Sequence, residues 1–232
     1  MLRHTRLGLV VGLMGLVSSP LLAQVRAGAS ASVEVISVDR EPRHRVVHSD
    51  ATLRVLEVRI PGEDVTLVHR HDHDLLTVNI ENGPTRTRAP GEEWSGIRAR
   101  EVGGVNITEY TGKPSAHAVW ATGQRAYTLT GVENLKPGGW TTLPPIQADF
   151  LKVALEGRSF RAYDVRLPAS ASTSHQHAVP VVAVLVEGGA SVAGSQSPAL
   201  SSPGQWVLTP AGSMHRITGT DRGAQVIEIE VR

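Results

Sequence analysis

The stretch LRVLEVRIP, residues 53–61, alternates apolar and polar side chains and returns in similar form as FRAYDVRLP, residues 160–168. Residues i and i+2 of a β-strand face the same way, so each copy predicts a strand with one buried face. Further runs of this kind, broken by Gly and Pro, follow both copies. The sequence therefore predicts an all-β sandwich or barrel, in which IQADFLKVAL (146–155) is the best candidate for a short helix.

The repeat continues downstream of these two strands. The copies keep a histidine pair, a turn and a later single histidine in the same order: HRH (69–71) with HQH (175–177), ENG (81–83) with EGG (187–189), and His117 with His215. A chance alignment would not keep these features in register. We therefore expect two tandem β-domains at 46–136 and 147–232, with a polar lead-in at 24–45 and a linker at 137–146.

Residues 1–23 have the pattern of a secretory signal. Arg3 and Arg6 precede an apolar run, LGLVVGLMGLV (7–17), and Ala23 is a small residue suited to the position before cleavage. A later cleavage site in AGASA is an alternative. The run is shorter than the ~20 apolar residues that span a bilayer. We expect a periplasmic or secreted protein that has no membrane anchor once the signal is removed.

The composition narrows the classes of partner and ligand. The chain has no cysteine, so it forms no disulfide, and any metal ligand must be a histidine or a carboxylate. Lys and Arg number 23 against 22 Asp and Glu, and the predicted signal contains two of the arginines. This near neutrality gives no reason to expect nucleic acid or an anionic membrane as partner. The expected partner is a small molecule.

The repeated histidines predict metal sites. On a strand, residues i and i+2 lie about 6.6 Å apart on one face, so an HxH pair can converge on one ion. A third histidine from another strand would complete one side of the coordination sphere. The candidate metal ligands are His69, His71 and His117 in the first copy, and His175, His177 and His215 in the second.

His73 complicates the choice in the first copy, because VHRHDHDLL (68–76) contains three alternating histidines. His69 and His73 would lie about 13 Å apart on a straight strand, too far to bind one ion. The repeat aligns His73 with Val179, outside the HxH pair of the second copy. We therefore expect His73 to line a pocket or support a ligand, while the shifted pair of His71 with His73 stays open.

The segment GQWVLTPAGSMH (204–215) matches G-x5-P-x-G-x2-H, the second motif of the cupins, at four positions: Gly204, Pro210, Gly212 and His215. His175, His177 and Gly188 have the spacing of the family's first motif. The duplicated arrangement resembles a bicupin. This resemblance implies two tandem double-stranded jelly-roll β-barrels, in which inward histidines hold a divalent metal at the base of a pocket.

The chain departs from the family motif at a chemically important position. Val181 in the second copy and Leu75 in the first stand where the motif has its metal-binding Glu. The first copy is also looser, because Gly62 lies one residue too far from the histidine pair and the segment before His117 is longer. Three neutral imidazoles suit iron, zinc, nickel or copper better than manganese or magnesium.

The resemblance implies a metal-dependent enzyme, dioxygenase-like, that acts on a small oxygenated organic molecule. An open metal ion would equally support an isomerase or lyase. The alternatives are a non-catalytic metal- or small-ligand-binding bicupin, and a structural bicupin in which one or both barrels, the first more readily, have lost their metal and the domains mainly pair. Strand phase decides which acid–base candidates face a pocket: His73, Glu109, Glu228 and Glu230. Exposed edge strands make a homodimer compatible with this reading.

Overall fold

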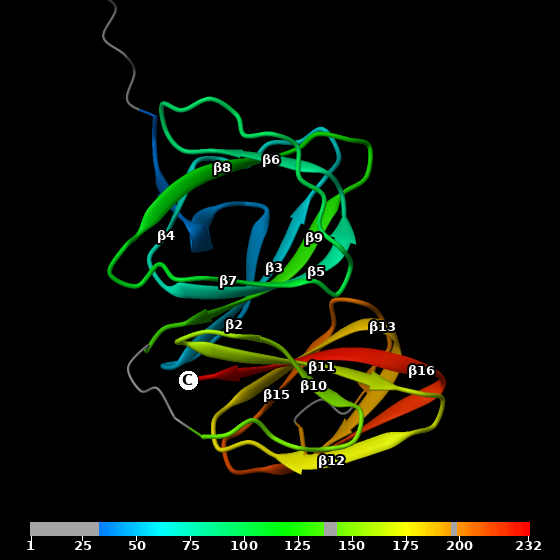
Figure 1. The fold of residues 1–232 in the computed structure, drawn as a ribbon. Coiled ribbons are helices and arrows are strands. Elements are labelled where there is room, and N and C mark those ends of the chain that lie inside the picture. Colours follow the sequence, from blue (N-terminus) through cyan, green and yellow to red (C-terminus); the bar gives the residue numbers. More distant parts are fainter. Residues whose placement is uncertain (1–32, 137–142, 196–198) are drawn as a thin grey trace, which may run out of the picture. The chain divides into compact units, whose positions relative to one another are not determined.

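The computed structural model describes residues 33–136, 143–195 and 199–232 (Figure 1). In these ranges the regular secondary structure consists of β-strands and one 3-10 turn, η1 (Val38–Arg40). The expectation of an all-β chain is therefore confirmed. In the described ranges there is no helix long and apolar enough to cross a bilayer. The predicted signal, residues 24–32 of the lead-in and residues 137–142 of the linker lie outside the described residues.

The short helix predicted at 146–155 is wrong. Leu151–Glu156 forms strand β10, which pairs antiparallel with β11 (Phe160–Leu167). The apolar residues of this segment suit a helix as well as a strand, and the neighbouring strand decides between the two by supplying backbone hydrogen-bond partners.

The first half of the described chain forms a four-stranded and a five-stranded sheet, which together we call barrel 1. The first sheet has the order β1-β4-β8-β6 and the second β2-β3-β9-β5-β7. Strand β1 begins at Ile36, inside the predicted lead-in. The strands are β1 (Ile36–Ser37), β2 (His44–Ser49), β3 (Leu53–Ile60), β4 (His69–His71), β5 (Asp74–Asn82), β6 (Thr85–Arg88), β7 (Val105–Thr108), β8 (Ser115–Ala121) and β9 (Tyr127–Asn134).

The second half, residues 151–231, repeats this strand order, and we call it barrel 2. Besides β10 and β11 it contains β12 (Ser172–Gln176), β13 (Val181–Ala193), β14 (Ala199–Leu200), β15 (Trp206–Thr209) and β16 (Met214–Val231). The long strand β16 pairs with β12 through its first part and with β11 through its second part. The series β10-β11-β16-β13-β15 therefore reproduces β2-β3-β9-β5-β7 of barrel 1.

One hydrophobic cluster joins the two barrels. It contains Leu53 and Leu76 from barrel 1, and Phe160 and Ile229 from barrel 2, all fully or almost fully buried. Each barrel also has a smaller cluster of its own. Residues Val33–Arg232 form one compact unit. The shared cluster buries one face of β3 and β5 in barrel 1, so the opposite face of these strands is left to line the interior.

Candidate metal centres

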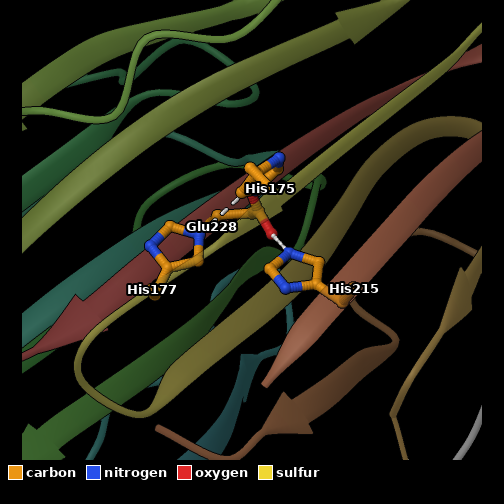
Figure 2. Close-up of side chains that lie close together, drawn as sticks. All are labelled: His175, His177, His215 and Glu228. Atoms are coloured by element: carbon orange, nitrogen blue, oxygen red, sulfur yellow. Dashed lines mark hydrogen bonds and ion pairs between the residues drawn. The ribbon is translucent and has the colours of Figure 1, made fainter. Parts of the chain in front are cut away.

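In barrel 2, three histidines and one glutamate meet, with one ligand atom from each residue within 4.8 Å of all the others. Strand pairing places His175 on β12 opposite His215 on β16. His177 follows directly after β12, and Glu228 comes from the later part of β16 (Figure 2). All four side chains are buried.

The carboxylate of Glu228 lies at the centre of this group. Nε2 of His175 lies 2.7 Å from one Glu228 oxygen, and Nε2 of His215 lies 2.6 Å from the other. Nε2 of His177 is 3.7 Å from the carboxylate and has no hydrogen-bond partner among the described residues. The three Nε2 atoms therefore converge on one point, an arrangement that fits a bound cation.

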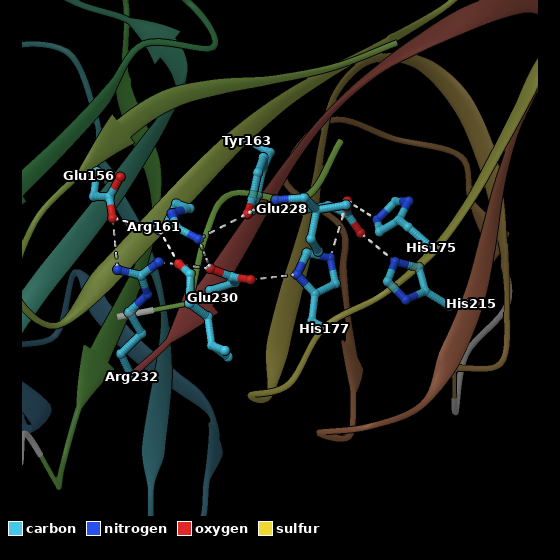
Figure 3. A network of polar contacts seen from close by, with 11 residues as sticks. Glu156, Arg161, Tyr163, His175, His177, His215, Glu228, Glu230 and Arg232 are labelled. Carbon is cyan, nitrogen blue, oxygen red and sulfur yellow. Dashed lines mark hydrogen bonds and ion pairs between the residues drawn. The ribbon is translucent and has the colours of Figure 1, made fainter. Parts of the chain in front are cut away.

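A further carboxylate orients His177. Nδ1 of His177 contacts Glu230 at 2.9 Å, and Arg232 donates to the same carboxylate at 3.2 Å (Figure 3). A histidine that donates from Nδ1 to a carboxylate keeps its Nε2 lone pair for a metal. Burial opposes protonation, but the nearby carboxylates of Glu228 and Glu230 raise the pKa of His177 to about 9. Burial likewise opposes the charge of Glu228, yet the three histidines hold the pKa of its carboxyl well below the usual value.

Barrel 1 gathers a second group of histidines. His69 and His71 lie on β4, and His117 on β8 faces His69 across the strand pair. The ring of His117 lies 4.7 Å from the ring of His69 and 5.1 Å from that of His71, measured between centroids. His44 on β2 joins them, with a ligand atom within 4.8 Å of those of His69 and His71. The structure thus brings together the three predicted ligands and one histidine that was not predicted.

His69, His71 and His117 in barrel 1 are neutral over a wide pH range. Burial, with repulsion from neighbouring imidazoles, lowers the pKa of His69 to about 3, of His71 to about 2 and of His117 to about 4. Nδ1 of His69 donates to the carbonyl of Leu67 at 2.9 Å, and its buried Nε2 has no partner in the described chain. Neutral imidazoles with unshared lone pairs are the form that binds a metal.

A cavity of about 530 Å³ reaches three of the four clustered histidines of barrel 1. Part of its wall is apolar, including Leu56, Val58 and Leu129. Its polar lining includes His44, His71, His117, Tyr110, Arg88, Arg98, Arg100, Glu92 and Glu93. None of the four clustered residues of barrel 2 borders this cavity or either of two smaller surface hollows.

Of the acid–base candidates named from the sequence, Glu228 lies in the barrel 2 group and Glu230 contacts His177. The other two lie outside both groups. His73 is half-buried between β4 and β5, and Glu109 is exposed after β7. Val181 indeed occupies the motif position without a carboxylate, but Glu228 brings one to the histidines from a different strand. Each barrel thus places a fourth possible ligand beside the three predicted histidines, Glu228 in barrel 2 and His44 in barrel 1. Sequence reasoning missed His44 because it falls in the predicted lead-in and has no histidine counterpart in the second copy.

Comparison of sequences finds no match: no family model fits the chain, and no curated protein is similar to it. Comparison of structures finds a salicylate 1,2-dioxygenase from Pseudaminobacter salicylatoxidans, with TM-score 0.61 and 10% identity over 84% of this chain and 77% of that chain. The bacterial pirin YhhW from Escherichia coli, in complex with nickel(II), gives 0.58 and 14% over 81% and 90%. A cupin 2 conserved barrel domain protein from Leptotrichia buccalis gives 0.53 and 8% over 82% and 88%. At these identities the similarity shows a shared fold.

Proposed function

We propose that this chain, which has the cupin fold expected from its motifs, is an exported metal-dependent enzyme that acts on a small oxygenated organic molecule. The observation that carries the proposal is the cavity of about 530 Å³ that reaches His44, His71 and His117 in barrel 1. A salicylate 1,2-dioxygenase and a nickel-bound pirin among the structural neighbours support a metal-dependent, dioxygenase-like activity.

Three residues would hold the cation in barrel 1, His44, His69 and His71, whose ligand atoms lie within 4.8 Å of one another. The predicted ligand His117 lies beside them. Their nitrogen atoms suit iron, zinc, nickel or copper. A redox-active ion supplies chemistry with dioxygen, and a redox-inert ion polarises a carbonyl oxygen. Glu41 orients His44, because its carboxylate lies 2.7 Å from Nδ1 and leaves Nε2 for the centre.

The cavity lining indicates the kind of molecule that binds. Its apolar wall would cover a carbon skeleton, and Arg88, Arg98 and Arg100 would attract a carboxylate or phenolate group. None of these guanidinium groups forms an ion pair with a carboxylate of the described chain, although Glu92 and Glu93 share the lining. A small organic anion is therefore the substrate class that the cavity fits.

Tyr110 is a candidate for orienting such a substrate. Its ring stacks on His71, with 4.8 Å between centroids and 12° between planes, and it lines the cavity. Burial raises the pKa of its phenol, so the hydroxyl keeps its proton at neutral pH. A protonated phenol beside the histidines can donate a hydrogen bond to an oxygen of the substrate.

The proposal is tested on the full chain loaded with iron, zinc, nickel or copper in separate samples. Metal content is measured by elemental analysis, and oxygen uptake is followed with a panel of carboxylic and phenolic compounds. We expect turnover with one metal, and its loss in His69→Ala with one fewer bound ion. Conversion without oxygen uptake would favour the isomerase or lyase alternative. Tight binding of panel compounds with no conversion would favour a small-ligand-binding protein.

A further inference from the structure

We infer that barrel 2 holds a second cation in a ligand shell that the protein itself closes through Glu228, and that this centre stabilises the fold. The inference goes beyond the proposed reaction in barrel 1. It concerns other residues and stands whether or not barrel 1 converts a substrate.

The position of Glu228 is revealed by strand register. Glu228 pairs with Tyr163 in barrel 2, and Gly131 pairs with Leu56 in barrel 1. Tyr163 and Leu56 occupy the same place in the repeated strand, so Glu228 corresponds to Gly131. The carboxylate at the centre of barrel 2 is thus replaced in barrel 1 by a residue without a side chain. Gly131 lines the open cavity there.

The register of the first strand of each barrel shows the reverse replacement. His44 pairs with Val58 in barrel 1, and Leu151 pairs with Val165 in barrel 2. Val58 and Val165 correspond in the repeat, so His44 corresponds to Leu151. The two barrels have therefore exchanged their fourth candidate ligand. Barrel 1 takes an imidazole from its first long strand, and barrel 2 takes a carboxylate from its last.

Packing closes the centre of barrel 2. In barrel 1 the inward side chains of β3 line the cavity: Leu56, Val58 and Ile60. The side chains of β3 and their counterparts on β11, Tyr163, Val165 and Leu167, all belong to buried hydrophobic clusters. The difference is that Tyr163 and Val165 border neither this cavity nor the two surface hollows. A metal held by four protein ligands without an open position is typical of a structural site, whereas catalytic sites keep a position for water or substrate. Barrel 2 has the first character and barrel 1 the second.

The ligands of barrel 2 also connect distant parts of the chain. His175 comes from β12, while His215 and Glu228 come from the two ends of β16. Behind His177, Glu230 binds the side chain of Arg232 (Figure 3). The backbone N–H of Arg232 donates to the carbonyl of Ser159. The carbonyl of Arg232 accepts a hydrogen bond from the side-chain amide of Asn134 in barrel 1. A cation here would hold β12 to both ends of β16 and would support the contact of barrel 2 with barrel 1.

The test compares Glu228→Gln with His69→Ala, the matched control in barrel 1. Each full-length protein is stripped with a chelator and loaded with Co²⁺; bound ions are counted, and Tm is measured with and without the metal. We expect two ions in the wild type and one in each variant. Glu228→Gln should weaken its site by more than the 10–100-fold typical of losing a supporting residue, and should lose most of the metal-dependent rise in Tm. His69→Ala should keep that rise.

Azide, used as a probe ligand, tests whether each site is open. It should change the visible spectrum of Co²⁺ in the wild type and in Glu228→Gln, where barrel 1 is loaded, and leave the spectrum of His69→Ala unchanged. Should Glu228→Gln fail to fold, His175→Gln removes a ligand of the same centre. Two ions with unchanged affinity in these barrel 2 variants, or a response to azide in His69→Ala, would overturn the inference. Lack of turnover alone would leave the ion counts untouched and would count only against the proposed function.

Discussion

Glu133 and Glu230 are corresponding side chains of the two barrels, but they have different partners. Strand register places Glu133 opposite Arg54 and Glu230 opposite Arg161. Glu230 contacts Nδ1 of His177, whereas Oε1 of Glu133 and Nδ1 of His71 are both buried without a partner in the described chain. Glu133 keeps only the hydrogen bond from Arg54, at 2.9 Å. Burial, opposed by Arg54, raises the pKa of Glu133 to about 7.

This raised pKa predicts how stability varies with pH. The folded state holds the proton of Glu133 more tightly than the unfolded chain, whose ordinary value is 4.5. Glu133 therefore contributes most to the free energy of unfolding below pH 4.5. This contribution, up to about 3 kcal/mol, is lost as the pH rises to about 7. Glu133→Gln should flatten this part of the profile. The free energy of unfolding of the metal-free protein is measured with urea at pH 5 and pH 8, with the exposed Glu81→Gln as control. If the difference between the two pH values is the same in Glu133→Gln as in the wild type, the raised pKa of Glu133 is contradicted.

Arg100 allows a second test on a single side chain. It lines the cavity, and its charge acts on the phenols of Tyr110 and Tyr127. Arg100→Gln should raise KM for an anionic substrate by about 10–100-fold and change kcat little, because a hydrogen bond to a charged group contributes about 1.5–3 kcal/mol. Steady-state kinetics measure the effect. Arg59→Gln, in an exposed ion pair with Glu81, is the control. Equal KM values for all three proteins would exclude Arg100 from substrate binding.

Strand β16 connects the candidate centre of barrel 2 with the contact between barrels. Its 18 residues begin beside β12 and end beside β11. Inward residues such as Glu228 alternate with residues such as Ile229, which pack in the cluster shared with barrel 1. Because successive side chains of a strand face opposite ways, one strand supplies a ligand and a core residue side by side.

Ile229→Ala should lower the free energy of unfolding by about 2–5 kcal/mol, because Ile229 is fully buried and its truncation leaves a cavity in the shared cluster. Chemical denaturation measures the loss. Val153→Ala on β10, where the side chain is 42% exposed, should change stability by less than about 0.5 kcal/mol. A small effect at Ile229 would mean that the contact between the barrels contributes little to stability.

The whole molecule has few ways to unfold in parts, because the barrels share apolar and polar contacts. Besides the common hydrophobic cluster, Asp74 at the start of β5 accepts the hydroxyl of Ser159 and is paired with Arg158 at 3.3 Å. Asn134, at the end of β9, bonds the last residue of the chain. Separating the barrels would expose these buried groups together.

We therefore expect one cooperative thermal transition for the metal-free protein, without an intermediate that keeps one barrel folded. Asp74→Ala should lower the free energy of unfolding by about 1–3 kcal/mol, because the groups that donate hydrogen bonds to the buried carboxylate are left without an acceptor. Calorimetry of both proteins measures the number of transitions and the loss. Two separate transitions in the wild type would show that each barrel folds alone.

Short-range patterns were enough to predict the all-β fold class, the internal repeat and six of the clustered histidines. Alternation of side chains fixes which residues share a face, and His69, His71, His175 and His177 lie in HxH pairs. Their later partners were found through the repeat and the cupin motif, since both copies keep the same order of strands. Patterns of this kind depend on neighbours within a few residues, or on one copy matching the other.

His44, the cavity and the place of Glu228 among the histidines could not be predicted in this way, since the sequence leaves Glu228 as one of four acid–base candidates. Each barrel carries its fourth candidate ligand on a different strand, so the repeat conceals both residues, and Glu228 has the alternating neighbours of an ordinary solvent-facing charge. Their roles depend on strand register between segments far apart in the chain. Whether Leu56 lines a cavity or Tyr163 fills a core depends on side chains that approach from several strands at once. Long-range pairing and packing alone separate the open centre from the closed one.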